Sequence, residues 1–366
     1  MLELARVLAG PWAGQTLADL GADVIKVEGP EGDNTRAWGP PYIERADGVR
    51  EAAYYHACNR GKRGIVADFR QADDLQRVQA LAAGADVLIE NFLPGKLARF
   101  GLDYQSLSAI NPALVYCSIT GFGQTGPRSA EPGYDFVIQA MSGFMALTGD
   151  PAGEPMKHGL AISDLFCGLY AVSAIQAALL MRERTGPMQG RGQHIDMALF
   201  DCSVSLLANQ AMALFACGEN PPRMGNEHLQ VSCYGVFPVS DGEVVLAPGN
   251  DALFRRLLRV LGREDLAEDA RFATNAARLA NREALREVVS AETRGWTRAA
   301  LLAACAEAGI PAGPINALDE VFADPQTLAR GLKVELDGVL GVRSPFVFSG
   351  ARLALDRASP GLGGDG

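Results

Sequence analysis

The amino-acid sequence predicts an α/β fold built around an open, doubly wound parallel sheet. The main observation is a near repeat, because GADVIKVE (21–28) and GADVLIEN (84–91) each place a short apolar run after an amphipathic helical pattern. The two helices are predicted over roughly 10–20 and 72–83 and end at a glycine, which tolerates the left-handed conformation at a helix C-terminus. This alternation of helix and strand is typical of a Rossmann-like sheet.

Further apolar runs extend the predicted sheet. Residues 65–67 and 114–119 are predicted to form two more buried strands, and residues 194–197 a short one. The remaining helices of this half are predicted from Asp135 to about Leu147, from about Asp164 onward, and up to about Cys217.

Irregular segments follow three of these strands. They are GPEGDNTR (29–36), NFLPG (91–95) and GFGQTGP (121–127). Because the carboxyl ends of parallel strands meet at one edge of a sheet, we expect these segments to build a binding site there.

The pattern of predicted secondary structure changes after residue 217. Residues 218–250 contain turns and short strands, with a hairpin predicted at 238–246 around Asp241-Gly242. Residues 251–308 are predicted to be helical, with Thr297 as an N-cap. We therefore predict a large α/β domain over 1–217, a smaller inserted α+β domain over 218–310, and a return to the large domain over 311–366 through IPAGPIN (310–316).

Composition limits the function classes. The chain has 33 basic and 43 acidic residues in 366, a net charge of −10, which disfavours nucleic acid as a partner. Seven dispersed cysteines without a C-x-x-C pair indicate reduced thiols and a cytoplasmic location. The apolar run from Leu165 to Met181 contains Ser173 and Gln176, so a buried helix is favoured over a membrane span, and no membrane partner is expected.

Common catalytic motifs do not fit. GFGQTG (121–126) matches G-x-G-x-x-G, but Pro127 and an irregular segment follow where a dinucleotide site needs a helix. The four histidines show no metal-ligand spacing, so no metal is expected. A G-x-S-x-G elbow and a phosphate-binding G-x-x-x-x-G-K-[ST] loop are also absent from the sequence.

One acid stands in an unusual setting. Asp164 lies where an irregular, glycine-containing segment meets the most apolar helix of the chain. Ser163 or Asp164 could serve as a helix N-cap, worth about 1 kcal/mol. Alternatively, a carboxylate that faces backbone N–H groups at a helix start stays ionised and localised, as a nucleophile must. Position alone leaves both interpretations open.

Two basic clusters lie near predicted strand ends. Arg60, Lys62 and Arg63 form the first, and Lys96 with Arg99 the second. In an acidic protein such clusters suit an anionic, phosphorylated small ligand, although a solvated charged turn explains the first cluster equally well.

Longer motifs resemble a known family over nearly the whole chain. They are RVLAGPWAGQTLADLGADVIKVEGPEGDNTR, NRGKRGI, DVLIENFLPGKLARFGLDY, GYDFVIQAMSG, GLAISDLFCGLYA, the Thr185–Gln193 segment and GPINALDEVFADPQ. In this order they resemble the class III CoA-transferases, also called the CaiB/BaiF family. The resemblance implies an enzyme that moves CoA from an acyl-CoA donor to a free carboxylic acid, with no permanently bound cofactor. It also implies an obligate homodimer of two interlocked rings.

The resemblance places Asp164 at the family's nucleophile position. It implies attack on the thioester to form an aspartyl anhydride, followed by an aspartyl-CoA thioester. The implied CoA ligands are Arg70 at the adenine end, Asn91, Phe92 and Leu93 along the pantetheine and diphosphate, Arg99 for phosphate, and Gly133, Tyr134 and Asp135 near the thioester. Arg36 and Lys62, in the Asn59–Arg63 turn, are implied neighbours.

Departures from the pattern bear on the substrate. Formyl-CoA:oxalate transferases carry a glutamine near the position of Leu8 and a tetraglycine loop where this chain has GNEH (225–228), so oxalate and formyl-CoA are disfavoured. Gly225, Asn226 and His228 are predicted to form the substitute loop, with His228 binding a substrate carboxylate. GYDFVIQAMSGFMALTG, RMGNEH and YGVFPVSDG resemble the succinate–hydroxymethylglutarate branch, which favours a dicarboxylate such as succinate or glutarate.

Three alternatives stay open. An α-methylacyl-CoA racemase shares the fold, but racemases carry a histidine where this chain has Tyr134, and a phenol is a poor substitute for an imidazole base. A non-catalytic CoA-binding homologue would have no need of Asp164 in its motif. A dehydrogenase would require NAD binding.

Overall fold

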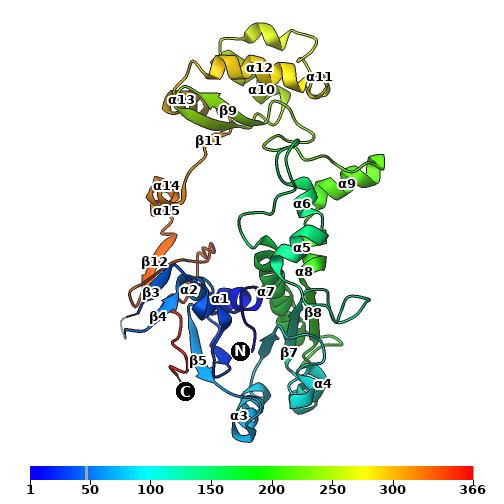
Figure 1. Cartoon of the computed structure of the whole chain (residues 1–366), viewed down its shortest axis with the longest axis vertical. Helices are drawn as coiled ribbons and strands as arrows, with labels where there is room; N and C mark the ends of the chain where they lie inside the picture. The colour runs from blue at the N-terminus through cyan, green and yellow to red at the C-terminus, as the bar shows by residue number, and fades with distance from the viewer. Residues whose placement is uncertain (46–47, 366) are drawn as a thin grey trace. The chain divides into compact units, whose positions relative to one another are not determined.

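The computed structural model describes residues 1–45 and 48–365 and divides the chain into two compact units (Figure 1). The large unit comprises residues 1–145, 157–211 and 325–366, and the small unit comprises residues 146–156 and 212–324. Segment 310–316, where we expected the chain to return, belongs to the small unit because β11 (Ala312–Pro314) pairs with β10 (Gly242–Leu246) there. The large unit therefore resumes only at Pro325.

A six-stranded parallel sheet forms the centre of the large unit. In spatial order its strands are β5 (Lys62–Val66), β2 (Val24–Glu28), β1 (Leu2–Glu3), β6 (Val87–Glu90), β7 (Val115–Thr120) and β8 (His194–Ala198). The chain moves outward from β1 to β5 and then returns to the other side of β1 to add β6, β7 and β8. The predicted doubly wound parallel sheet is confirmed, and its strand order reverses between β1 and β6. Such a switch point opens a crevice at the carboxyl ends of the strands.

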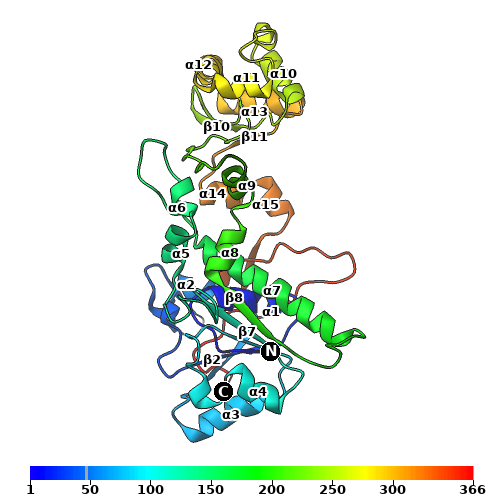
Figure 2. The same cartoon turned by 90° about the vertical axis from the view of Figure 1, so that its right-hand side faces the viewer.

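Helices cover both faces of this sheet (Figure 2). α1 (Ala9–Asp19) and α7 (Ile162–Glu183) pack with the odd-numbered residues of β6 and β7 in one core cluster. α3 (Ala72–Ala83) packs with even-numbered residues of the same strands in another cluster, to which α4 (Tyr104–Ile110) adds Leu107. Side chains alternate between faces along a strand, so each strand contributes to both clusters.

α7 is the long helix predicted from the sequence. Its Cys167, Ala171 and Ile175 lie fully buried in the core, so the prediction of a buried helix is confirmed for this face. The opposite face exposes large apolar side chains, among them Leu169 and Tyr170. By length and composition alone α7 could also cross a membrane, and the bent pair α8 (Leu199–Ser205) and α9 (Ala208–Cys217) meets the same criterion.

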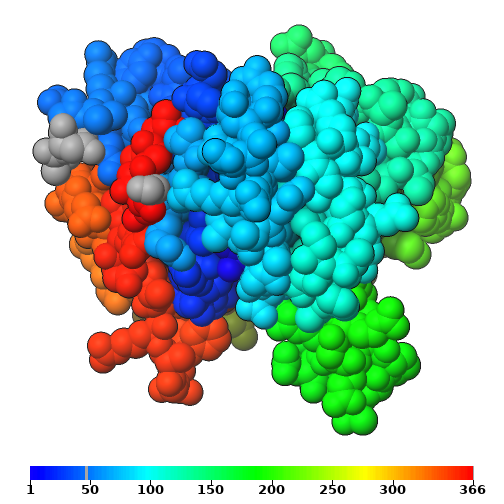
Figure 3. Space-filling model, turned by 90° about the horizontal axis from the view of Figure 1, so that it is seen from below, coloured from blue at the N-terminus to red at the C-terminus, as the bar shows by residue number. Residues whose placement is uncertain are grey.

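Short elements complete the large unit. They are the hairpin β3 (Tyr42–Glu44) and β4 (Arg50–Ala52), α2 (Ala53–His56), α5 (Asp135–Met141), α15 (Pro325–Ala329) and the hairpin β12 (Lys333–Leu336) and β13 (Val339–Val342). α6 (Phe144–Leu147) begins in the large unit, and its last two residues belong to the small unit. The helix predicted from Asp135 to Leu147 is divided because Gly143 adopts a φ of 94°. The C-terminal segment lies against the N-terminal strands, as Figure 3 shows, and Tyr55 Oη donates a 3.1 Å hydrogen bond to the Pro360 carbonyl.

The small unit contains a three-stranded antiparallel sheet in the order β11–β10–β9. β9 (Gly235–Val239) and β10 form the predicted hairpin. The helices are α10 (Asp251–Val260), α11 (Asn275–Ala280), α12 (Arg282–Thr293), α13 (Arg298–Glu307) and α14 (Leu318–Ala323). Thr297 accepts a hydrogen bond from the Ala300 N–H, so the predicted N-cap of α13 is confirmed.

A fully buried ion network joins the first three strands. Lys26 Nζ donates to Glu3 Oε1 at 3.3 Å and to Asp33 Oδ2 at 3.1 Å. Lys62 Nζ donates to the same Glu3 oxygen at 2.8 Å and to Asn59 Oδ1 at 2.8 Å. Removing one partner from such a network leaves an uncompensated buried charge, at a cost of about 3–5 kcal/mol. The network therefore fixes β1, β2 and β5 relative to one another.

The contact between α1 and α7 predicts a sensitive glycine. A Cβ on Gly168 would lie 2.6 Å from the Ala9 carbonyl oxygen and 3.1 Å from Trp12 Cδ1. Gly168→Ala should lower the free energy of unfolding by about 1–3 kcal/mol through overpacking, despite the better helix propensity of alanine. Urea denaturation measures this change. Gly84→Ala, with its nearest neighbour 4.0 Å away, is the control, and equal stability of both variants would contradict close helix packing.

Candidate active site

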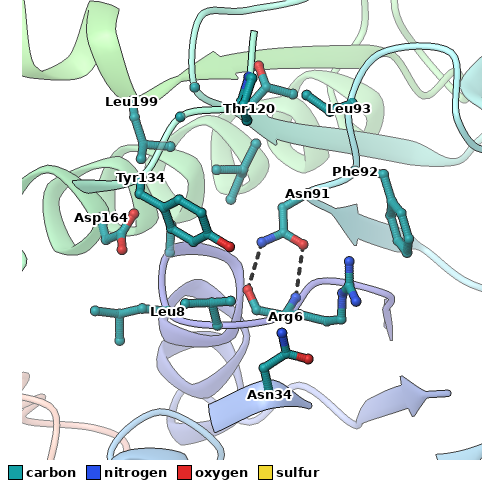
Figure 4. A pocket seen from close by; sticks show the side chains of 16 residues that line it. Arg6, Leu8, Asn34, Asn91, Phe92, Leu93, Thr120, Tyr134, Asp164 and Leu199 are labelled. Atoms are coloured by element: carbon teal, nitrogen blue, oxygen red, sulfur yellow. Dashed lines mark hydrogen bonds between the residues drawn. The ribbon is translucent and has the colours of Figure 1, made fainter. Parts of the chain in front are cut away.

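A cavity of about 180 Å³ lies at the switch point of the sheet (Figure 4). It is lined by the segments that follow β1, β6 and β7 and by the starts of α1 and α7. The lining residues are Arg6, Val7, Leu8, Ala9, Asn34, Asn91, Phe92, Leu93, Ile119, Thr120, Gly121, Pro132, Gly133, Tyr134, Asp164 and Leu199. The predicted location at the strand carboxyl ends agrees with this cavity.

The segment between β1 and α1 is held in place by three contacts. Val7 adopts a φ of 71°, unusual for a β-branched residue, and its N–H donates to Asp33 Oδ2 at 3.1 Å. Asn91 Nδ2 donates to the Arg6 carbonyl at 2.7 Å, and Asn91 Oδ1 accepts from the Arg6 N–H at 2.9 Å. Asn91 thus ties together the two strands that flank the switch point (Figure 4).

The two loops beyond β7 touch through their backbones. A Cβ on Gly121 would lie 2.7 Å from the Gly133 Cα, and a Cβ on Gly133 would lie 2.6 Å from the Gly121 Cα. Both positions therefore require glycine. The contact sets Tyr134, whose ring lies beside Asp164 in Figure 4, at the wall of the cavity.

Asp164 lies in the first turn of α7 and lines the cavity. The capping hypothesis is wrong, because Ala161 is the N-cap residue and neither Ser163 nor Asp164 forms a side-chain cap. Asp135 takes over part of that role, since its Oδ1 accepts a 2.8 Å hydrogen bond from the Ser163 N–H. Within the described residues, the Asp164 carboxylate has no hydrogen-bond partner.

The environment of Asp164 favours its neutral form. Burial raises its pKa to about 7, and the nearby Asp135 carboxylate adds to the shift. Burial also raises the pKa of Tyr54 to about 12, with a contribution from the Asp164 charge. A carboxyl group with a raised pKa in a cavity is typical of a functional site.

The predicted CoA ligands divide into two groups. Asn91, Phe92, Leu93, Gly133 and Tyr134 line the cavity with Asp164, and Asp135 supports it from behind. The cavity wall lacks Arg36, Lys62, Arg70 and Arg99.

Other contacts occupy those four basic side chains. Arg36 pairs with Glu28 and Glu51 and lies 3.7 Å above the Tyr55 ring, and Lys62 is part of the buried ion network. Arg70 pairs with Asp68, and Arg99 lies 4.5 Å above the Phe100 ring. Arg36 and Lys62 are therefore held by acidic partners outside the cavity, and the prediction that they are CoA ligands is not supported.

The predicted substrate loop belongs to the small unit. Gly225 adopts a φ of 58°, and its N–H donates to the Gly149 carbonyl at 3.1 Å. His228 Nδ1 accepts a 3.0 Å hydrogen bond from the Gln230 N–H, and its ring packs near Tyr234. Asn226 lies between these two anchored residues.

The sequence analysis placed Asn34 in a segment expected at the site, GPEGDNTR (29–36), but missed Arg6, Val7, Ala9, Ile119, Thr120, Pro132 and Leu199, and it considered Leu8 only as a specificity position. One available signal was the ARVLAGP segment directly after the first strand, at the sheet edge where a site was expected. As for metals, the described residues contain no group of three or more His, Cys, Asp or Glu side chains that could hold an ion.

The comparisons with known proteins identify the family of this chain. The family model described as CoA-transferase family III matches residues 1–366. The chain belongs to CoA-transferase family III. It is a family III CoA-transferase whose substrate is an acyl-CoA, as the resemblance implied.

Curated relatives cover nearly the whole chain. It is 55% identical to the succinate–glutarate CoA-transferase of Agrobacterium fabrum, over 99% of this chain and 92% of the relative. It is 39% identical to the succinyl-CoA:glutarate CoA-transferase of Mus musculus, over 99% and 83%. A CaiB/BaiF family protein of known structure from Brucella suis matches with a TM-score of 0.89 and 58% identity, over 99% of this chain and 95% of that protein.

The raised pKa of Asp164 predicts a pH-dependent cost to stability. A carboxyl group whose pKa is higher in the folded than in the unfolded state destabilises the fold at any pH where it must ionise. For Asp164 this cost is absent below about pH 4, grows as the pH rises, and is complete above about pH 7. Asp164→Asn should therefore raise the free energy of unfolding by about 1–3 kcal/mol at pH 8, with the gain shrinking as the pH falls toward 4.

Urea denaturation of both proteins at several pH values tests this expectation. The exposed Asp356 supplies the control, since Asp356→Asn should leave the difference near zero at every pH. A gain from Asp164→Asn that is the same at pH 4.5 and pH 8 would show that Asp164 titrates normally.

Proposed function

We propose that this enzyme exchanges coenzyme A between succinyl-CoA and a dicarboxylate such as glutarate, with Asp164 as the nucleophile. The observation that carries the proposal is the Asp164 carboxyl group, which lies in the cavity at the switch point with a raised pKa. The named activities of relatives at 55% and 39% identity support the choice of acids.

The proposed chemistry passes through four acyl transfers, all at the Asp164 carboxylate. Asp164 attacks the thioester carbonyl and expels the CoA thiolate, which leaves a mixed anhydride of aspartate and the donor acid. The thiolate then attacks the aspartyl carbonyl, so the donor acid departs and an aspartyl-CoA thioester remains. The acceptor carboxylate attacks this thioester and expels the CoA thiolate, which gives an anhydride of aspartate and the acceptor acid. The thiolate then attacks the acceptor acyl carbonyl of that anhydride, so the new acyl-CoA forms and the Asp164 carboxylate is released.

The environment of Asp164 suits this role. Burial and the Asp135 charge raise its pKa, so the ionised carboxylate is more basic and a stronger nucleophile than a solvated aspartate. The Asp135 bond to the Ser163 N–H fixes the start of α7 and thereby the position of the nucleophile. Leu8 and Ala9 place the start of α1, which has no side-chain cap, at the cavity wall, where its N–H groups favour developing negative charge.

The remaining cavity residues are proposed to bind the thioester end of acyl-CoA. Phe92 and Leu93 offer apolar surface to the pantetheine arm, and Asn91 and Tyr134 offer polar groups. Arg6 is the basic residue of the cavity wall and suits an anionic group of the substrate. We keep as predicted substrate ligands Arg70, Arg99 and the loop of Gly225, Asn226 and His228. The predicted location of the enzyme is the cytoplasm.

Replacing the nucleophile should abolish exchange. Asp164→Asn should lower the rate of glutaryl-CoA formation from succinyl-CoA and glutarate by at least about a thousandfold, because no anhydride can form. Hydroxylamine added to the wild type during turnover should convert Asp164 to a hydroxamate, which intact-mass and peptide mass spectrometry detect. Asp356→Asn is the matched control for loss of an exposed carboxylate.

The same assay separates the alternatives. Retained exchange in Asp164→Asn would contradict the nucleophile assignment. Absence of exchange in the wild type, with deuterium from solvent entering the α-position of a branched acyl-CoA, would favour the racemase. Oxalate and succinate belong in the acceptor panel, and a preference for oxalate would contradict the assignment of succinate and glutarate as the acids.

We propose a homodimer as the working form. The supporting observation is the outer face of α7, where Phe166, Leu169, Tyr170, Leu180 and Met181 are each more than a third exposed. Large exposed apolar side chains on a core helix are costly in water and are typical of a subunit interface, although Ser173 and Gln176 interrupt this face. The family resemblance implies that the two chains interlock.

Charges on this face should prevent assembly. Wild-type protein should elute with the mass of two chains in size-exclusion chromatography with light scattering. Leu169→Lys with Leu180→Lys should yield monomer or misassembled protein, because two ammonium groups would be buried without partners. Ile110→Lys, on the exposed side of α4, is the control. A monomeric wild type would overturn the proposal.

A further inference from the structure

A second cavity, of about 270 Å³, lies on the sheet face opposite α7. Glu90, Ser118 and His194 reach it from three neighbouring strands, β6, β7 and β8. The proposed chemistry uses none of these side chains. The cavity wall continues through Leu93, which also lines the first cavity, so one short segment separates the two spaces.

Glu90 connects this second cavity to the first. It is the last residue of β6 and directly precedes Asn91, Phe92 and Leu93. Glu90 is only 5% exposed, and its Oε2 accepts a 2.8 Å hydrogen bond from the Phe92 N–H. The Ser118 hydroxyl also hydrogen-bonds to Glu90 and lies 2.9 Å from His194 Nε2. The carboxyl group therefore holds the turn that forms one wall of the first cavity.

Few positively charged groups lie near the Glu90 carboxylate. His194 from β8 is stacked on Tyr104, and burial lowers its pKa, so it stays neutral near pH 7. The other titratable groups on this face are Tyr116 of β7, Tyr104 of α4 and Asp103, which precedes α4, while Cys117 of β7 lies on the opposite face, where the Glu90 charge contributes to its raised pKa. No lysine or arginine is among the described residues that line the cavity. Burial raises the pKa of Glu90 to about 7, and the cavity gives its proton a route to solvent.

We propose that Glu90 is a positioning residue whose ionised carboxylate holds the 91–93 turn in the form that binds acyl-CoA, and whose protonation loosens that turn. The inference rests on the proposed function of the first cavity. A hydrogen bond to a carboxylate is roughly twice as strong as one to a neutral acceptor. Loss of the charge should therefore weaken acyl-CoA binding about fivefold, an effect that sets in as the pH falls through neutrality.

The test measures binding without chemistry. Asp164→Asn removes the nucleophile and its own titration, and 3′-dephospho-CoA removes the phosphate that titrates near pH 6. Isothermal titration calorimetry should give a Kd about fivefold higher at pH 6 than at pH 8 for D164N. The D164N/E90Q double variant should show the weaker Kd at both pH values, because glutamine keeps the acceptor oxygen but carries no charge.

A second variant covers the case in which E90Q does not fold. The Ser118 hydrogen bond lowers the pKa of Glu90, so D164N/S118A should keep the pH dependence and shift its midpoint upward. D164N/E264Q, altered in the small unit, should match D164N throughout.

Each outcome decides the matter. A pH-dependent Kd that survives in D164N/E90Q, or a flat Kd in D164N, would overturn the role of Glu90. Absence of 3′-dephospho-CoA and CoA binding by D164N at every pH would instead overturn the proposed function of the first cavity. A merely structural Glu90 would lower stability in E90Q without removing the pH dependence.

Discussion

The large unit depends on the charge of Glu3, which is buried between two lysines at the centre of the sheet. Burial alone would lower the pKa of Lys26, but Glu3 and Asp33 raise it above its usual value, whereas burial lowers the pKa of Lys62. Lys26 therefore stays charged and binds Asp33, and Asp33 in turn holds the Val7 N–H. The shape of the first cavity thus depends on a salt bridge in the core of the sheet as well as on contacts at its rim.

Much of the fold could be predicted because it depends on local patterns. The repeat of GADV placed β2 and β6, the periodicity of 72–83 gave the bounds of α3, and Thr297 marked the start of α13. The edge of the sheet that carries the site was predicted from the irregular segments after three strands, because the carboxyl ends of parallel strands meet at one edge. These features need only neighbours in the sequence, so a single chain reveals them.

The remaining features depend on partners far along the chain. Lys62 lies in a charged turn by sequence, yet it reaches inward because Glu3, 59 residues earlier, provides a counter-charge. Arg36 is neutralised in the same way by Glu28 and Glu51. Asp164 could not be separated from a helix cap until Asp135, 28 residues earlier than Ser163, was seen to take the N–H. Spacing rules contain no information on such pairs.

The discontinuous course of the large unit bears on its synthesis. Residues 354–365 bond to Asp19, Tyr55, Gly61 and Gly64, so the edge of the sheet at β5 stays incomplete until these residues have been synthesised. The small unit is nearly continuous over 212–324 and is available to fold earlier. Domains generally fold as units during translation. A nascent chain of this protein therefore carries an unfinished sheet edge after the whole of its small unit has been synthesised.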